Sequence, residues 1–346
     1  MTEGSQVTTQ ASVSVFMSNY NHAPFIRIAL EALLGQTLRP SRIYVVDDAS
    51  TDDSASIIMD YAARHPDIIV PNLLSENRGC IANVRAWLAT DTSDFIFIAS
   101  ADDRVFPTLL EESLALLLRF PRAGVCSALS RVMDKDGNDL GRFQAWSPLR
   151  EAHYIAPDQA GGLLETHDGW FLGTTTVYRG EALRSVGFDP VLGGFADGFV
   201  CRVLAMRDGV GFIPKELASW RQMRTGMAAQ DAAAPTSVHR IANRASELMR
   251  GAYRHLFSER YIERWNRRWT YWAVAAAYDL PHAKRDAILG ELTAPLPAGH
   301  RLGLRIFSTF CFKPLRTVAK GAAFLLLRPQ DLLPALQRAI SRSLGR

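Results

Sequence analysis

Acids and amides suited to a charged ligand recur at four points in the first third of the chain. Each point comes within a few residues of the end of an apolar run: Asn19-Tyr20-Asn21, Asp47-Asp48, Asn77 and Asp102-Asp103. Carboxylates accept hydrogen bonds from a nucleobase or a ribose, and they bind hard divalent cations that also bridge phosphates. The pattern therefore predicts a polar ligand site at which carboxylates can bind a divalent metal ion.

The segments between these points predict the elements that position them. Short runs rich in β-branched residues predict strands, and stretches with helical spacing separate the runs. Strands are expected at 13–17, 42–48, 68–74, 94–100 and 124–129, and helices at 23–34, 54–64, 81–89 and 108–119. This alternation predicts an α/β fold with a parallel sheet covered on both faces, in which ligands bind outside the carboxyl ends of the strands.

Four segments carry a resemblance to a known family: Val13–Asn21, Tyr44–Asp52, Glu76–Gly79 and Phe97–Asp103. Their order and spacing resemble the inverting family-two glycosyltransferases of GT-A fold, over about residues 11 to 225. The resemblance implies a GT-A-like (Rossmann-like), mainly parallel sheet flanked by helices. It also implies transfer of a sugar from a nucleotide-diphosphate sugar to an acceptor hydroxyl. Cell-surface polysaccharide or glycolipid assembly is the usual context of the family.

The resemblance places the donor at the strand ends. The expected donor contacts in this region are Ser18, Tyr20, Asn21, Asp48 and Asn77. Tyr20 is expected to pack on the base, and Asp48 to accept hydrogen bonds from a uracil or a ribose. An alternative, compatible with this one, makes Asp47 and Asp48 a capping cluster ahead of the helix at Ser54.

The family's acidic motif is usually Asp-x-Asp, and its last acid binds the metal. Here Ser100 replaces the first acid, so Asp102 takes the metal role by position. The expected cofactor is Mg²⁺ or Mn²⁺, and Asp103 is also expected beside the donor. Two plainer alternatives are a solvated acidic turn and, for Asp103, a cap on the helix near Thr108.

A second acidic motif follows the turn Gly187-Phe188-Asp189. Asp197 stands after Ala196 where the family often has Glu-Asp, so the resemblance assigns the general base to Asp197. The helix that follows favours a negative charge at its N-terminus. The alternative role for Asp197 is an N-cap of that helix.

Two further groups are expected near the phosphates and the acceptor. Arg221 and Arg224 resemble the family's stretch that closes over the pyrophosphate, where arginines bind phosphate oxygens bidentately. Their alternative is a solvated face. Trp170-Phe171 either lines an acceptor pocket or belongs to the core.

The rest of the chain predicts three parts: a disordered tail at 1–10, a catalytic domain at 11–230 and a helical, basic region at 231–346. Residues 225–236 resemble a mobile linker. From Arg301 onward the sequence contains nine Lys or Arg residues and one acid, together with apolar residues such as Phe307 and Phe310. This composition suits either an amphipathic surface on an anionic membrane or a helical appendage packed on the catalytic domain.

Bulk properties limit the other function classes. The net charge of +4 over 346 residues gives no argument for nucleic acid. The polar N-terminus, the widely spaced cysteines and the lack of an 18-residue apolar run favour a cytoplasmic location, with attachment to the inner face of the membrane as an option. Because Ser100 and Ala196 replace acids, the alternative function is a non-catalytic nucleotide-sugar or glycan-binding relative. The sequence does not support a nucleotidyltransferase function, since residues 17–24 contain no Gly-rich phosphate-binding loop.

Overall fold

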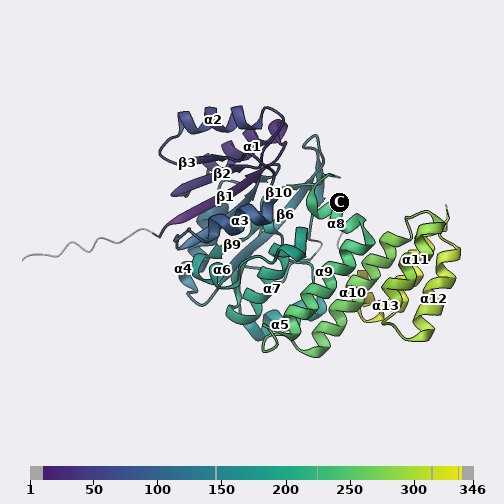
Figure 1. The fold of residues 1–346 in the computed structure, drawn as a ribbon. Helices are drawn as coiled ribbons and strands as arrows, with labels where there is room; N and C mark the ends of the chain where they lie inside the picture. The colour runs from purple at the N-terminus through teal and green to yellow at the C-terminus, as the bar shows by residue number, and fades with distance from the viewer. Residues whose placement is uncertain (1–10, 145, 224, 313–314, 334, 337–346) are drawn as a thin grey trace, which may run out of the picture.

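The computed structural model describes residues 11–144, 146–223, 225–312, 315–333 and 335–336. The expected disordered tail at 1–10 and the phosphate contact of Arg224 concern residues outside these ranges. In Figure 1 a twisted sheet and its covering helices make up the N-terminal part, and helices α10 to α13 gather to one side of it.

Five long strands run close to the positions that the sequence predicts: β1 (Val13–Asn19), β2 (Arg42–Asp47), β3 (Ile69–Leu73), β4 (Phe95–Ser100) and β6 (Val125–Met133). A further long strand, β10 (Val210–Arg221), was not predicted. The shorter strands are β5 (Arg104–Val105), β7 (Asp139–Arg142), β8 (His153–Ile155) and β9 (Val177–Arg179). The sheet order is β3-β2-β1-β4-β9-β6-β10-β5, with β7 on β6 and β8 on β10. The long pairings are parallel and the short ones antiparallel, which confirms the expected mainly parallel α/β fold.

Helices cover both faces of the sheet, as a continuous apolar strand such as β1 requires. The helices between the strands are α1 (Ala23–Leu34), α2 (Ser54–Arg64), α3 (Cys80–Leu88) and α4 (Leu109–Arg119). Side chains alternate along β1, so Phe16 packs in the core on the α3 side, with Val84. Its neighbours Val15 and Met17 pack in the other core, with α1 and α2. Because helices cover both faces, the carboxyl ends of β1, β2 and β4 are held together at one edge of the sheet.

The second half of the chain adds helices and short 3₁₀ segments. Those that precede β10 lie around the sheet. They are α5 (Pro157–Thr166), η1 (Gly173–Thr175), α6 (Gly180–Val186), η2 (Pro190–Phe195) and α7 (Ala196–Asp208). After β10 come α8 (Met227–Ala233), α9 (Pro235–Arg250), α10 (Glu259–Ala277), α11 (His282–Thr293), α12 (Ala298–Thr309), α13 (Arg316–Leu327) and η3 (Pro329–Asp331). The expected helical C-terminal region is therefore confirmed.

The segment expected to be a mobile linker is helical instead. Residues 227–233 form α8, and the Gly194 N–H donates to Asp231 Oδ2 at 2.9 Å, which ties α8 to η2. This tie joins residues far apart in the sequence, so a composition rich in small residues does not reveal it. Beyond α8, Ile241 and Trp265 pack in the same core as Phe16, whereas α10 to α13 share a further core around Tyr278 and Leu304.

Candidate active site

The strand register brings the predicted polar residues to one edge. Ser18 pairs with Ser100 across β1 and β4, and Asn19 pairs with Asp47 across β1 and β2. The buried Asn19 donates from Nδ2 to Asp47 Oδ1 at 2.7 Å and to Ser50 Oγ at 3.1 Å. Motifs that are about thirty and eighty residues apart in the sequence therefore meet at a single site.

Tyr20 and Asn21 form the turn after β1. Asn21 has a φ of +56°, its backbone N–H donates to Ser50 Oγ at 2.9 Å, and its Oδ1 accepts from the Thr51 N–H at 2.8 Å. These bonds fasten the turn to the loop after β2. The Tyr20 side chain is 45% exposed, so its ring has a surface on which a base can stack.

Asp48 fixes the loop that carries Asn77. Its carboxylate is buried and accepts from the backbone N–H groups of Arg78 and Gly79, each at 2.8 Å. Gly79 has a φ of +84°, a conformation that favours glycine. Asn77 is exposed beside this turn, and its Oδ1 accepts from the Gly79 N–H at 3.1 Å.

The alternative role of Asp47 and Asp48 as a cap on α2 is wrong. Asp47 accepts from Ser50, and the backbone N–H of Ser54 instead donates to Asp52 Oδ1 at 3.0 Å. Asp48 therefore shapes the entry to α3 and not the entry to α2.

The start of α3 also places Cys80 next to Ser18. Cys80 is exposed, whereas Cys126, Cys201 and Cys311 are buried. Asn83, one turn further along α3, reaches toward the Ser18 hydroxyl, with 3.5 Å between Nδ2 and Oγ.

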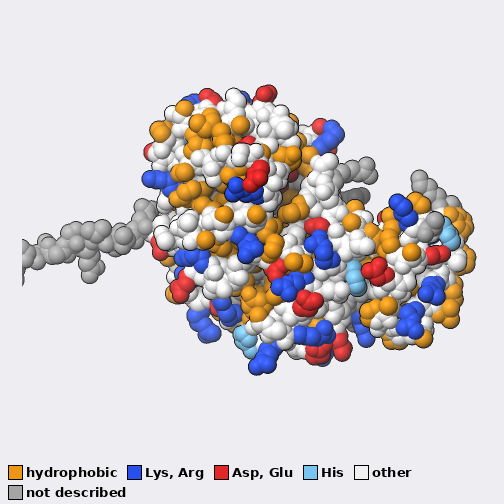
Figure 2. Space-filling model, in the orientation of Figure 1, with side chains coloured by type: hydrophobic (Ala, Val, Ile, Leu, Met, Phe, Trp, Pro, Cys, Tyr) orange, Lys and Arg blue, Asp and Glu red, His pale blue; other side chains and the backbone are white. Residues whose placement is uncertain are grey.

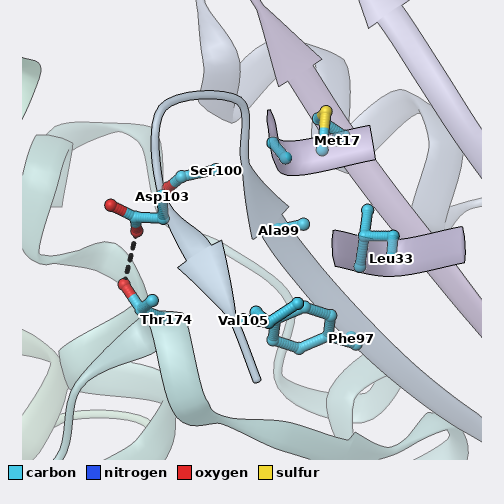
Figure 3. A pocket seen from close by; sticks show the side chains of 9 residues that line it. Met17, Leu33, Phe97, Ala99, Ser100, Asp103, Val105 and Thr174 are labelled. Carbon is cyan, nitrogen blue, oxygen red and sulfur yellow. Dashed lines mark hydrogen bonds between the residues drawn. The ribbon is translucent and has the colours of Figure 1, made fainter. Parts of the chain in front are cut away.

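Asp103 is held inside the protein by η1 and by the end of β10. Its Oδ2 accepts from Thr174 Oγ1 at 2.6 Å, and its Oδ1 accepts from the Arg221 N–H at 2.7 Å. Figure 3 shows this carboxylate beside a small void of about 10 Å³ that Met17 and Phe97 help to line. Burial and the neighbouring Asp102 raise the pKa of Asp103. Its alternative role as a cap on α4 is wrong, because its carboxylate is used by Thr174 and Arg221.

Asp102 is less enclosed than Asp103, and its surroundings suit a metal ligand. Burial raises the pKa of its carboxyl, while His22 and Arg221 lower it. Within the described ranges no group of three His, Cys, Asp or Glu residues is arranged to hold a metal ion. Magnesium-type ions are commonly held by one or two carboxylates together with substrate phosphates and water. Asp102 fits such a site, because a cation would offset the cost of its burial.

Arg221 ties three segments together at this edge. It is 4% exposed, and its Nε donates to the Asp102 carbonyl at 2.8 Å. Its Nη1 donates to the carbonyls of Asp134 and Lys135, each at 3.1 Å, and the guanidinium lies 4.5 Å from the centre of the Phe25 ring. The solvated-face alternative is therefore wrong for Arg221, which positions the backbone of Asp102.

Asp197 lies in the first turn of α7. Phe195 is the N-cap residue, so the alternative role of Asp197 as the N-cap is wrong. The Gly198 N–H donates to Asp197 Oδ1 at 2.6 Å. Burial raises the pKa of Asp197, although the Gly198 N–H and the Arg202 charge lower it. The net effect of these groups is that desolvation, which raises the pKa of Asp197, is larger than the opposing effect of the Gly198 N–H at the start of α7.

Two groups that support Asp197 were not predicted from the sequence. A Cβ on Gly173 would lie 2.1 Å from Asp197 Oδ2, so the missing side chain makes room for the carboxylate. The buried Arg202 donates from Nη1 to the Gly198 carbonyl at 2.8 Å and pairs through Nη2 with Asp168 Oδ1 at 2.9 Å. Only the folded contacts reveal these roles, since Asp168 and Arg202 are 34 residues apart.

Comparison with known proteins agrees with this geometry. Residues 14–179 match the model of glycosyl transferase family 2. An uncharacterized glycosyltransferase of Nostoc sp. is 30% identical over 213 residues, which cover 60% of this chain and 64% of that protein. The chain thus spans less than two thirds of this relative.

Solved structures share the fold. TarS of S. aureus, in complex with UDP-GlcNAc, has a TM-score of 0.63 at 16% identity, covering 92% of this chain and 90% of that one. A mannosyltransferase of Pyrobaculum calidifontis, in complex with GDP-Man and Mn²⁺, has a TM-score of 0.54 at 19% identity, covering 94% and 88%. The fold is therefore GT-A-like, and residues 14–179 are similar to glycosyl transferase family 2.

Proposed function

We propose that this protein is a metal-dependent, inverting glycosyltransferase that moves a sugar from a nucleotide-diphosphate sugar to an acceptor hydroxyl. The observation that carries the proposal is the half-buried carboxylate of Asp197 in the first turn of α7, within the same domain as the polar strand edge. The fold neighbours that bind UDP-GlcNAc and GDP-Man support a nucleotide-sugar donor.

Asp197 acts as the general base in this proposal. Its carboxylate takes the proton of the acceptor hydroxyl while the acceptor oxygen attacks the anomeric carbon. The bond from that carbon to the diphosphate breaks, and the attack from the opposite side inverts the configuration. A positioned base contributes roughly 10²–10⁴-fold to such a step, and a raised pKa makes the carboxylate a stronger base.

The donor is proposed to bind along the strand edge. Tyr20 packs on the base, and Asp48 keeps the loop of Asn77 in place while its remaining lone pairs face the ribose or base. Ser18 and Asn21 line the same edge.

The phosphates are proposed to lie by Asp102. Asp102 would hold Mg²⁺ or Mn²⁺, which offsets the charge of the departing diphosphate. Asp103 and Arg221 keep the Asp102 turn in position. Arg221 and Arg224 are the proposed phosphate ligands of this segment.

We also infer peripheral attachment to the cytoplasmic face of a membrane, in keeping with polysaccharide or glycolipid assembly. Leu302 and Ile306 on α12 and Phe310 at its C-cap recur every four residues and are 61%, 48% and 48% exposed. Arg301 and Arg305 flank them, and Figure 2 shows apolar and basic side chains together at the outer edge of the C-terminal helices. Among the described residues, no helix has the length and apolar character needed to cross a bilayer. The attachment is therefore proposed through this surface.

A panel of nucleotide sugars tests the proposed function. The full chain is screened by thermal shift with and without Mn²⁺, and release of nucleoside diphosphate is then measured with each stabilising donor. We expect a donor whose binding is strengthened by the metal, and we expect the Asp102→Asn protein to lose that strengthening while it stays folded. Turnover that continues undiminished in excess chelator would contradict metal dependence. Binding without any release of nucleoside diphosphate would favour the non-catalytic alternative, which the loss of acids at Ser100 and Ala196 suggests.

A further inference from the structure

A large cavity lies between the sheet domain and the C-terminal helices. Its volume is about 750 Å³, within the roughly 300–1,000 Å³ typical of ligand pockets. Trp170 and Trp220 line it from the sheet domain, and Trp269 and Trp272 line it from α10. Residues of α8 and η3 complete the wall. The cavity is thus shared by segments from both halves of the chain.

The cavity adjoins the proposed base. Gly194 and Phe195, which line the cavity, directly precede the first turn of α7 with Asp197. Gly169 and Trp170 also line it, and the same segment continues to Gly173, against which the Asp197 carboxylate lies. Both segments that hold the base therefore also form the cavity wall.

The wall is rich in aromatic rings. Of the seven tryptophans in the chain, five line the cavity: Trp146, Trp170, Trp220, Trp269 and Trp272. The Trp146 ring stacks on His167 with 4.2 Å between centroids, and Trp269 packs against Phe195 at 4.8 Å. A sugar ring has an apolar C–H face that packs on such rings, while its hydroxyls need hydrogen-bonding partners at the edges.

A polar group suited to a hydroxyl is present. The Trp170 side chain is 1% exposed, and its indole N–H has no acceptor within the described residues. An unsatisfied buried donor costs stability, so a ligand oxygen placed there would be bound favourably. Gln144 and Gln222 add amide groups to the same lining.

The charged groups of the lining already have partners of opposite charge. Asp331 pairs with Arg268 at 2.9 Å and with Arg328 at 2.8 Å. Asp168 pairs with Arg202, and Asp231 lies 3.6 Å from Arg240. A phosphate or another anion would have to compete for these arginines. An uncharged ligand needs no such exchange.

We propose that this cavity is the acceptor site and that the acceptor is a neutral saccharide held by tryptophan stacking. The inference rests on the proposed function, because it takes Asp197 as the base that the acceptor must reach. It also gives the C-terminal helices a role, since the acceptor site is incomplete without α10 and η3.

Saccharide binding and donor turnover are measured separately to test the proposal. The full-length protein is applied to an array of neutral and phosphorylated oligosaccharides, and the retained neutral saccharides are titrated by calorimetry. Trp220→Ala and Trp272→Ala remove one ring from each wall, and Leu118→Ala, exposed on α4, is the matched control. Hydrolysis of the nucleotide sugar by water is followed in all four proteins, because it does not use the acceptor.

We expect both tryptophan variants to bind the saccharide about tenfold more weakly, the loss that follows when one aromatic stack is removed. Leu118→Ala should bind as the wild type does, and donor hydrolysis should be unchanged throughout. The proposal is overturned if no neutral saccharide is retained, if only phosphorylated ones are, or if both tryptophan variants bind normally. A protein that binds the saccharide through these tryptophans but never hydrolyses a donor would support the cavity assignment and contradict the glycosyltransferase proposal.

Discussion

Buried charges of both signs occur in both halves of the molecule, but the groups with which they bond differ. At the strand edge the buried groups include the carboxylates of Asp48 and Asp103, which accept hydrogen bonds from backbone N–H groups and a hydroxyl. In the C-terminal helices they include Arg268 and Arg285, which donate to backbone carbonyls. A carboxylate with one or two N–H partners keeps lone pairs for a ligand, whereas an arginine on several carbonyls has most of its donors occupied.

The arginines therefore brace the helices. Arg285 joins the Leu280 carbonyl at 2.9 Å to the Ser308 carbonyl at 2.8 Å, which links the segment after α10 to α12. Arg268 joins Asp331 to the carbonyls of Leu164 and Glu165 at the end of α5. We infer that buried acids serve binding and catalysis at the edge, and that buried arginines serve stability in the helices.

Removal of Asp331 should have the largest effect on stability. Asp331 is 1% exposed and pairs with both Arg268 and Arg328, so Asp331→Ala leaves two buried cations without their partner. Breaking a buried pair in this way costs about 3–5 kcal/mol. Urea unfolding should show this loss. The matched control is Asp279→Ala, which removes exposed pairs with Arg316 and Lys320 and should have a far smaller effect. Equal losses in the two variants would contradict the bracing role.

Replacement of Asp197 should lower activity without lowering stability, in contrast to replacement of Asp331. Asp197→Asn should transfer sugar at least about a hundredfold more slowly, because Asn is not a base. Since burial raises the pKa of Asp197, the folded protein is penalised for the ionised form once the pH exceeds that pKa. The neutral Asn avoids this penalty, so the variant should melt at or slightly above the wild-type temperature at neutral pH.

The same pKa shift predicts the pH dependence of the wild type. Transfer needs ionised Asp197, so kcat/KM should fall with decreasing pH, with a midpoint above the ordinary aspartate pKa of 3.8. Near-native transfer by Asp197→Asn would place the base elsewhere. Asp189, which accepts from the Val191 N–H at 2.8 Å, is then the next residue to test.

Gly173→Ala tests whether the Asp197 position, and not only its chemistry, matters. A Cβ at 2.1 Å from Asp197 Oδ2 forces the carboxylate to move, and a displacement of about 1 Å can cost up to about 10²-fold in rate. Donor binding should be unchanged. Gly162→Ala on α5 is the control, because its Cβ would meet nothing within 4 Å. If both variants transfer normally, the contact with Gly173 does not position the base.

The sequence predicts the strand edge well because each motif lies at the end of an apolar run. The bounds of α1 and α2 match the expected ones, and Asp48, Asp102 and Asp103 lie at the expected edge. The periodicity of these segments is local, so a single sequence contains it. The strands and helices that form this edge can therefore be predicted from short stretches of consecutive residues.

The support of these residues was not predictable in the same way. Thr174 bonds to Asp103 across 71 positions, and Arg221 bonds to the Asp102 carbonyl across 119. Arg268 reaches Asp331 across 63 positions, and the tryptophan-lined cavity forms only when α10 packs on the sheet domain. Such contacts depend on the topology, so the residue types alone left a solvated face open as the alternative for Arg221 and favoured a linker for the residues of α8.

Substitutions on the outer face of the C-terminal helices should have the smallest effect on the stability and the activity of the protein. The arginines of this face are less buried than Arg268 and Arg285: Arg301 and Arg305 accompany the exposed side chains of Leu302 and Ile306 on α12 and of Phe310 at its C-cap. Full-length protein should float with anionic vesicles at low salt, and less so as salt screens the attraction.

Replacing Ile306 and Phe310 by Ser should weaken vesicle binding about tenfold or more, since each buried apolar side chain contributes on the order of 1.5–3 kcal/mol. Met59→Ser, which alters an equally exposed side chain on α2, should float as the wild type does. Because these side chains are exposed, the variants should melt like the wild type, which separates this surface from the braced interior. A wild-type protein that never floats at low salt would show that the face has no membrane role.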